Sequence, residues 1–192
     1  MTSEPASVPP DGIDTDRKPL IFVGGPFTQL LDPTTGLVDE QHRKNYTAVM
    51  AHLSDRGFEV ENAHRREGWG ARLMAPDECT PADYLTLRSA VLFIAYPGNP
   101  ISPGTMVELG WMSAMAKPTI LLVERGSLLP PLVAGLHTVA PVRYLEVIDG
   151  QFNPRSLDAC LSQLLGTLPP AIDRMNGRSA ATVIKPVEHA VL

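Results

Sequence analysis

The segment from Ser102 to Glu108 places anion-binding groups one helical turn before a carboxylate. Ser102 is a favoured N-cap residue, and Pro103 suits the first helical position. Gly104 lets a ligand approach the backbone, and Thr105 adds a hydroxyl. Free N–H groups and the positive end of the helix dipole meet at such a start. We therefore expect Ser102, Gly104 and Thr105 to bind a phosphate; the alternative is an ordinary capped helix.

Glu108 lies on the same helix face as Gly104 and Thr105. Four helical residues span about 6 Å, which is roughly the reach from a 5'-phosphate to C1' of the same ribose. A phosphate docked on the helix start would thus place the anomeric carbon over this carboxylate, which could act as a nucleophile. The alternative is a solvated surface glutamate, and the apolar residues around Glu108 argue against it.

Asp83 is the second candidate carboxylate. The pattern Thr80-Pro81 predicts a helix that opens at Thr80, with Asp83 in its first turn. Glycoside cleavage commonly uses two carboxylates, so Asp83 could protonate the departing base or hold the sugar. The alternative is a capping role, because Thr80 and Asp83 have the spacing of a capping box.

Two further segments could hold a base or a sugar. The run NAHRREGWG at 62–70 offers hydrogen-bond donors and a stacking surface from His64, Arg66 and Trp69. The loop GGPF at 24–27 adds Phe27, which could stack on a base, and Gly25, which we assign to the phosphate site. The alternatives are a solvated charged loop for the first segment and a core phenylalanine for the second.

Alternating strand and helix patterns predict an α/β fold with a doubly wound, five-stranded parallel sheet of flavodoxin-like order. The strands are expected at 20–24, 58–63, 91–96, 119–124 and 142–148, and the helices at 39–56, 80–90, 103–116 and 154–165. The run from 64 to 79 reads as a polar loop. The strand order reverses between the first and third strands, so the loops GGPF and YPGNPISPG, which follow these strands, should border the ligand.

Composition indicates one globular domain at 18–168, with a disordered arm at 1–17 and a loose tail at 169–192. The net charge of −5 argues against binding of nucleic-acid polymers. The cysteines Cys79 and Cys160 lack zinc spacing. No signal peptide or membrane-spanning stretch is recognised. We expect a cytoplasmic protein that needs no metal or organic cofactor.

The helix predicted at 103–116 is apolar on nearly every face, so it should be buried all round. Because a sheet covers only one side of a helix, a second subunit is the simplest cover, and we expect a homodimer. The segment 129–137 could instead cover the same face within one chain.

The motifs GGPF, NAHRREGWG and SPGTMVELGW, together with the Asp83 helix, resemble the nucleoside 2-deoxyribosyltransferase superfamily. Within it the chain is most similar to the CMP and hydroxymethyl-CMP hydrolases of peptidyl-nucleoside antibiotic biosynthesis. The resemblance implies that Glu108 is the nucleophile, that Asp83 assists the base or the sugar, and that Ser102 and the following amides hold the 5'-phosphate. It also implies that His64 lies in the active site and that a neighbouring subunit helps to close it.

Two positions depart from related patterns. The transferases usually carry a tyrosine in strand one that orients the nucleophile, and Phe22 stands there, as in the CMP hydrolases. Thr28 stands where the hydroxymethyl-CMP enzyme has arginine, which favours CMP or another nucleotide. The expected activity is hydrolysis of CMP, or a 5-substituted CMP, to free base and ribose 5-phosphate. The alternatives are a deoxyribosyltransferase and a non-catalytic nucleotide sensor.

Overall fold

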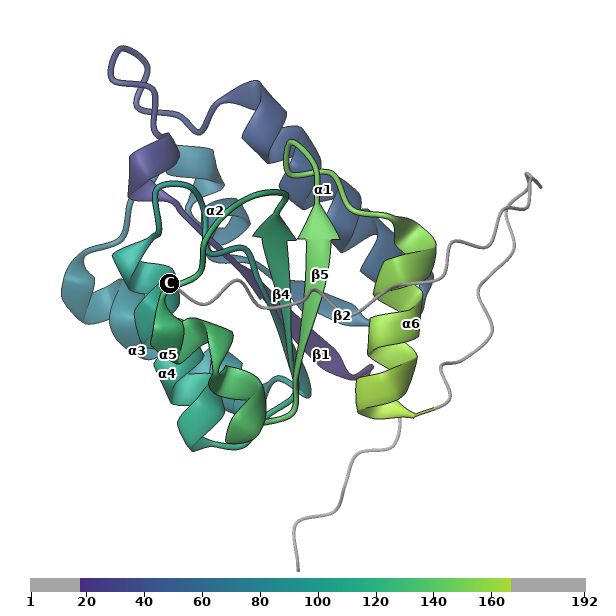
Figure 1. The fold of residues 1–192 in the computed structure, drawn as a ribbon. Coiled ribbons are helices and arrows are strands. Elements are labelled where there is room, and N and C mark those ends of the chain that lie inside the picture. The colour runs from purple at the N-terminus through teal and green to yellow at the C-terminus, as the bar shows by residue number, and fades with distance from the viewer. Residues whose placement is uncertain (1–17, 167–192) are drawn as a thin grey trace, which may run out of the picture.

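A computed structural model describes residues 18–166, so the predicted arm and tail lie outside the described residues. Its five parallel strands form one sheet in the order β2-β1-β3-β4-β5, which confirms the flavodoxin-like prediction (Figure 1). The strands are β1 (Leu20–Gly24), β2 (Glu59–Glu61), β3 (Leu92–Ala95), β4 (Thr119–Glu124) and β5 (Val142–Val147).

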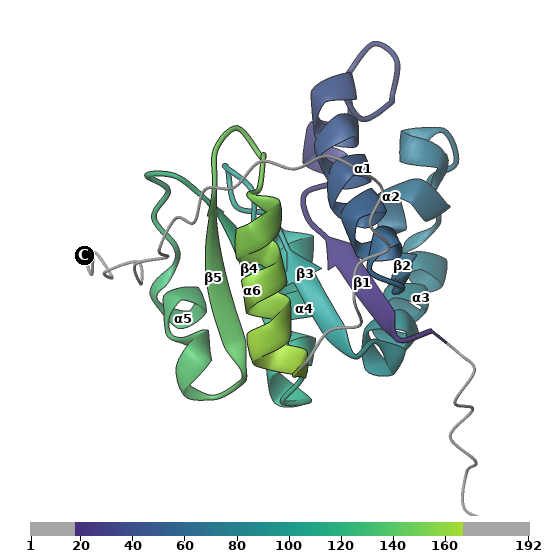
Figure 2. The ribbon, with the colours of Figure 1, turned by 90° about the vertical axis from the view of Figure 1, so that its right-hand side faces the viewer.

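Helices cover both faces of the sheet (Figures 1 and 2). Helices α1 (Glu40–Asp55) and α6 (Pro154–Leu165) pack on one face, and α3 (Pro76–Ser89), α4 (Pro103–Ala114) and α5 (Pro131–Ala134) lie on the other. Successive strand residues point to opposite faces, so Val23 joins the core beneath α1 whereas Phe22 joins the core beneath α3 and α4. Strand β3 is buried along its whole length, as a central strand of such a sheet must be.

The register between β1 and β3 determines where the two loops at the switch point leave the sheet. Phe22 lies opposite Phe93, and Gly24 lies opposite Ala95. Both strands therefore end together, and the GGPF loop leaves the sheet beside the loop that leads to α4. This edge is where ligands bind in doubly wound sheets.

Helix α3 begins earlier than predicted. It starts at Pro76 rather than Thr80, so Asp83 is not in its first turn and the proposed capping box of Thr80 does not exist. Glu78 caps the start of the helix instead, because its carboxylate accepts a hydrogen bond from the Ala75 N–H at 3.3 Å. Pro81 lies inside the helix, and its missing N–H falls on an exposed position.

The segment expected as one polar loop contains local structure. Asn62 accepts a hydrogen bond from the Arg65 N–H at 2.8 Å and thereby caps the short helix α2 (Ala63–Arg66). A 3₁₀ turn, η2 (Gly68–Gly70), follows. Two further 3₁₀ turns, η1 (Thr28–Leu30) and η3 (Leu136–Thr138), were also not predicted. These one-turn elements are too short to produce a hydrophobic period.

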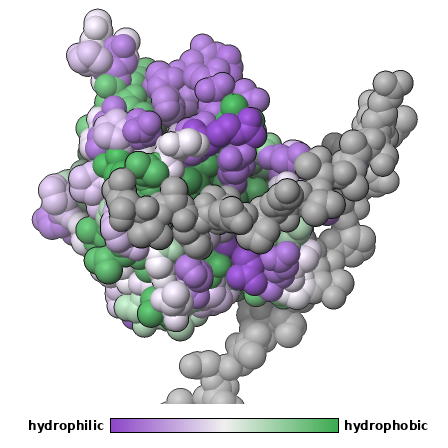
Figure 3. Space-filling model, viewed as in Figure 1, coloured by the Kyte–Doolittle hydropathy of each residue, from purple (hydrophilic) through white to green (hydrophobic). Residues whose placement is uncertain are grey.

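One chain alone does not bury α4 all round, so the predicted cover by a second subunit stays a prediction. Met112 is fully buried, but Val107 is 52% exposed and Gly110 is exposed beside it. Leu132 of α5 is also exposed. Figure 3 shows hydrophobic residues on the surface in the region of α4 and α5. Within residues 18–166, no helix has the length and apolar character needed to cross a membrane.

Candidate active site

Glu108 projects from α4 over the end of β1. Its Oε2 lies 2.8 Å from the position that a Cβ atom on Gly24 would occupy. The residue as a whole is partly exposed, but this oxygen is buried and has no hydrogen-bond partner among the described residues. The pKa of the Glu108 carboxyl is raised to about 8, because burial and, to a smaller extent, the charge of Asp83 raise it more than the charge of Arg66 lowers it. A desolvated carboxylate of this kind is a candidate nucleophile.

Asp83 lies close enough to Glu108 for the two charges to interact. Arg66 bridges α2 to α3, because its Nη2 donates to Asp83 Oδ1 at 2.5 Å. Both side chains are largely buried, with 24% and 17% of their surface exposed. The structure therefore brings together three of the predicted site residues that come from separate helices.

Four buried polar atoms of side chains lack a hydrogen-bond partner in the chain from residue 18 to 166: Tyr46 Oη, Arg66 Nε, Thr105 Oγ1 and Glu108 Oε2. Buried polar groups are nearly always paired in folded proteins, since an unpaired one costs about 1–3 kcal/mol. Three of these residues were predicted from the sequence, and all four belong to the elements that surround the end of β1. This concentration indicates a site prepared for a polar ligand.

The start of α4 has the predicted cap. Ser102 Oγ accepts a hydrogen bond from the Thr105 N–H at 3.4 Å, and Pro103 is the first helical residue. Gly104 is exposed, and a Cβ atom placed there would meet only Ser102 Oγ, at 3.9 Å. The backbone is therefore open to a ligand, as an anion site at a helix start requires.

His64 is buried and held through both ring nitrogens. Nε2 is 2.6 Å from the Pro26 carbonyl oxygen, so this nitrogen carries the proton and donates. Nδ1 then accepts from Asn62 Nδ2 at 3.1 Å. Burial lowers the pKa of His64 to about 4, which agrees with a neutral ring. Because both nitrogens are used, His64 fixes the GGPF loop and has no free polar atom for a ligand.

Aromatic rings pack around His64. The ring centroids of Phe27 and Tyr46 lie 4.6 Å and 4.4 Å from that of His64, and Trp69 lies 6.3 Å away. The guanidinium of Arg43 lies 5.3 Å from the Trp69 ring centroid. Three of the predicted base-binding residues, Phe27, His64 and Trp69, thus form one cluster with Tyr46, whereas Arg66 pairs with Asp83.

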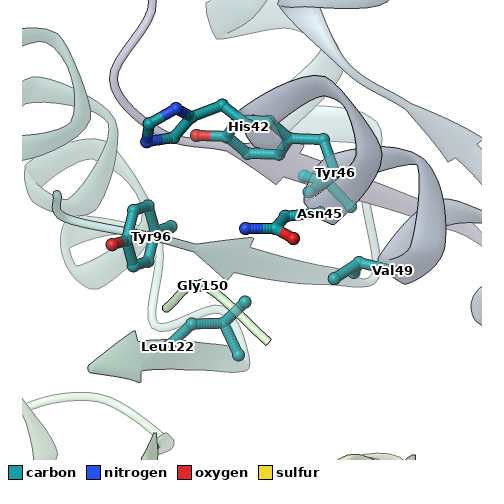
Figure 4. A pocket seen from close by; sticks show the side chains of 9 residues that line it. His42, Asn45, Tyr46, Val49, Tyr96, Leu122 and Gly150 are labelled. Carbon is teal, nitrogen blue, oxygen red and sulfur yellow. The ribbon is translucent and has the colours of Figure 1, made fainter. Parts of the chain in front are cut away.

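Tyr46, which lies in the helix expected at 39–56, was not among the predicted site residues. Its hydroxyl lies 2.0 Å from the place that a Cβ atom on Gly25 would occupy, so only glycine fits there. Figure 4 shows Tyr46 in a pocket at this edge of the sheet, with Asn45 and Tyr96. Periodicity could not identify this role, since a buried tyrosine matches an apolar pattern as well as a leucine does.

Comparison with solved structures places the chain beside two relatives. The structure of the Clostridium botulinum CMP N-glycosidase BcmB is 34% identical over 73% of this chain and 98% of that chain, with a TM-score of 0.55. The solution structure of BlsM is 36% identical over 82% of this chain and 98% of that chain, with a TM-score of 0.62. Comparisons with family models and with curated protein sequences give no match.

A flavodoxin-like sheet with a buried carboxylate above its switch point, together with these relatives, defines an enzyme of the N-glycosidase class. The chain belongs to the nucleotide N-glycosidases of the nucleoside 2-deoxyribosyltransferase superfamily, the family that includes BcmB. The resemblance inferred from the sequence motifs is thereby confirmed. Within residues 18–166, no three or more His, Cys, Asp or Glu side chains are grouped so that they could hold a metal ion.

Proposed function

We propose that this enzyme hydrolyses the N-glycosidic bond of a nucleoside 5'-monophosphate, CMP or a 5-substituted CMP, with Glu108 as the nucleophile. The observation that carries the proposal is the set of four unpartnered buried polar atoms around the end of β1. A nucleotide offers a sugar, a base and a phosphate that could pair with them. The similarity to a CMP N-glycosidase supports the choice of cytosine as base.

The proposed reaction has two steps. The Glu108 carboxylate attacks C1', the C1'–N bond breaks, and the electron pair leaves with the base, which takes up a proton. Water then attacks C1' of the glycosyl ester, the C1'–O bond to Glu108 breaks, and the proton of the water is released to solvent. The products are free base and ribose 5-phosphate, with Glu108 regenerated.

The electrostatics of the site suit this reaction. Positive charge develops at C1' as the base leaves, and a carboxylate in a water-poor site stabilises it strongly. Asp83 contributes a second negative charge close to Glu108, and Arg66 limits the repulsion between the two. We assign Asp83 to the leaving base or the sugar, where its carboxylate could transfer a proton or accept a hydroxyl.

The remaining contacts follow from the arrangement of the loops. Ser102, Gly104 and Thr105 would hold the 5'-phosphate together with Gly25, and the unpartnered Thr105 hydroxyl is available as a donor. Phe27 and Trp69 would stack on the base or the sugar. Arg66 would use its free Nε in the same contact. The fixed ring of His64 would act by holding Phe27 in place.

We further propose that the active unit is a homodimer. The exposed face of α4 carries Val107 and Gly110 on the side opposite to Leu109 and Met112, which are buried in the protomer. Tyr84 of α3 extends this apolar surface, since its ring contacts Trp111 of α4 at a centroid distance of 5.4 Å. A second copy would remove this surface from water a short distance from Glu108.

A nucleotide panel tests the proposed activity. Incubation with CMP, other nucleoside monophosphates and cytidine should release free base from CMP without any added acceptor. The kcat/KM for CMP should exceed that for cytidine by about tenfold or more, because each charge-assisted bond to the phosphate contributes about 1.5–3 kcal/mol. Base exchange that requires an added base would identify a transferase instead. Binding without turnover would identify a sensor.

A further inference from the structure

We propose that the site also hydrolyses nucleoside 5'-monophosphates whose base is a cationic pyridinium ring, a leaving group that departs without taking up a proton. The inference rests on the proposed function, because it uses Glu108 as the nucleophile and the same contacts to the phosphate. Three features carry it: the proton donors near the end of β1 are engaged, two carboxylates interact, and aromatic rings gather around a neutral histidine.

Three side chains that could protonate a departing base are poorly suited to do so. His64 donates from Nε2 to the Pro26 carbonyl oxygen at 2.6 Å and accepts at Nδ1, so its ring is neutral and fully paired. Asp83 accepts from the Arg66 guanidinium, and such a pair favours the charged carboxylate. Burial raises the pKa of the Tyr46 phenol well above its ordinary value, so this group keeps its proton. A base that leaves as a neutral molecule needs no proton from them.

The charges around Glu108 favour a cation. The carboxylates of Glu108 and Asp83 interact, and the charge of Asp83 raises the pKa of Glu108 more than the charge of Arg66 lowers it. A positive ring attached to C1' would therefore lie in the net negative potential of these groups. It would also lower the pKa of Glu108 in the complex and so increase the ionised fraction of the nucleophile.

Aromatic rings supply a second attraction. The ring centroids of Phe27 and Trp69 lie 4.6 Å and 6.3 Å from that of His64. The faces of such rings attract cations, and the guanidinium of Arg43 already lies 5.3 Å from the Trp69 centroid. Arg43 is exposed, so solvent screens its charge, and the neutral His64 adds no positive charge. The cluster can therefore attract a flat cation.

The aromatic cluster lies within electrostatic reach of the nucleophile. The Tyr46 ring lies 4.4 Å from His64, and the pKa of the Tyr46 phenol is raised by burial and, to a smaller extent, by the charges of Tyr96 and Glu108. His64 and Arg66 both belong to α2, so this short helix joins the rings to the ion pair. A six-membered pyridinium ring linked through N1 has the outline of cytosine, so the contacts proposed for CMP serve it too.

The reaction with such a nucleotide balances without an acid. The Glu108 carboxylate attacks C1', the C1'–N1 bond breaks, and its electron pair neutralises the ring nitrogen, so a neutral pyridine leaves. Water then attacks C1' of the glycosyl ester, the C1'–O bond to Glu108 breaks, and the proton of the water is released to solvent. With nicotinamide mononucleotide the products are nicotinamide and ribose 5-phosphate.

A pair of nucleotides with different ring charge tests the inference on the full chain. Nicotinamide mononucleotide has a cationic ring, whereas its dihydro form has a neutral ring that leaves only as an anion or after protonation. At pH 8, chromatography should detect nicotinamide and ribose 5-phosphate from the cationic form, with kcat/KM at least about 100-fold higher than for the dihydro form. Glu108→Gln should abolish this hydrolysis, and Glu146→Gln, at an exposed carboxylate on β5, should keep it. No hydrolysis of nicotinamide mononucleotide, or equal rates for the two forms, would overturn the inference.

The pH dependence with nicotinamide mononucleotide gives a second measurement. The kcat/KM profile reports Glu108 in the free enzyme, with a pKa of about 8, and the kcat profile reports it in the complex. Asp83 and Arg66, the other charged groups that act on Glu108, are the same in both states. The cationic ring should therefore move the rise in kcat to a pH about one unit lower than the rise in kcat/KM. Equal midpoints would contradict the contact between the ring and the carboxylates.

CMP measured alongside separates this inference from the proposed function. Cleavage of CMP without cleavage of nicotinamide mononucleotide would reject the inference and leave the proposed function standing. Cleavage of nicotinamide mononucleotide alone would support the inference and reject CMP as the substrate.

Discussion

Glu108 Oε2 lies 2.8 Å from the position that a Cβ atom on Gly24 would occupy, and the ring of Phe93 lies 2.9 Å from that position. Gly24→Ala would therefore push the carboxylate aside, since Phe93 is buried and cannot yield. We expect kcat with CMP to fall at least about tenfold, because a small misplacement of a nucleophile is costly.

Gly135→Ala is the matched control for this substitution. A Cβ atom at Gly135 would meet its nearest neighbour, the Pro131 carbonyl oxygen, at 3.4 Å, and this position lies at the end of α5. The control should keep wild-type kcat. If Gly24→Ala also turned over CMP at the wild-type rate, the close contact between Glu108 and β1 would not be needed for catalysis.

Glu108→Gln should abolish turnover and leave nucleotide binding measurable by calorimetry. Glutamine keeps the shape of the side chain but cannot form the glycosyl ester, so we expect kcat to fall by several orders of magnitude. Glu146→Gln removes an exposed carboxylate on β5 that pairs with Arg125, and it should remain active. A Glu108→Gln enzyme with a tenth of wild-type kcat would disprove the assignment of the nucleophile.

The pH dependence should show the raised pKa of Glu108. Only the ionised carboxylate attacks, so kcat/KM should rise with pH and level off above a pKa of about 8 in the free enzyme. Removing the charge of Asp83 with Asp83→Asn removes one cause of the raised value and should move this rise to lower pH. A pH profile of kcat/KM for both proteins checks the shift, and a profile flat from pH 6 to 9 would contradict it.

His64 should make the fold sensitive to acid. Its pKa is lowered from 6.5 to about 4 in the folded state, so the unfolded chain binds the proton first as the pH falls. The contribution of His64 to stability is complete above pH 6.5 and is lost progressively between pH 6.5 and 4, by about 3 kcal/mol.

Glu108 acts in the opposite sense, because its raised pKa makes the fold less stable as the pH rises from 4.5 to about 8. Urea unfolding at pH 7 and pH 4 is therefore best measured in the Glu108→Gln background. Adding His64→Gln should reduce the loss of stability between these two pH values by about 3 kcal/mol. Adding His137→Gln, at an exposed histidine, should leave that loss unchanged. Equal losses for the two double variants would exclude a buried neutral His64.

The exposed face of α4 offers a test of the proposed dimer. A charge at Met112 would disrupt the protomer itself, because this side chain is fully buried, so the informative substitution is Val107→Asp. We expect Val107→Asp to sediment as a folded monomer with kcat reduced about tenfold or more, because a charge in an apolar interface is costly. Val91→Asp, at a 38% exposed valine before β3, should leave assembly unchanged. Wild-type protein that is monomeric and fully active under assay conditions would refute the dimer.

Local patterns in the sequence determined the elements and the start of α4. Apolar runs and helical periods gave five strands in alternation with helices, and β4 and α6 have the predicted bounds. Ser102 caps α4 as expected, and Glu108 then lies one turn further along. These features depend on residues within a few positions of one another. Capping, helix periodicity and strand burial act at that range, so a single sequence can reveal them.

Only the tertiary structure decided how these elements meet. The ion pair of Arg66 with Asp83, the burial of His64 beneath the GGPF loop and the approach of Tyr46 to Gly25 all join residues far apart in the chain. From the sequence alone, Tyr46 can be interpreted as a core residue and Asp83 as a capping residue. Their neighbours in the folded chain show different roles. The raised pKa of Glu108 comes from burial and from nearby charges. Both arise from residues that are brought together only when the chain folds.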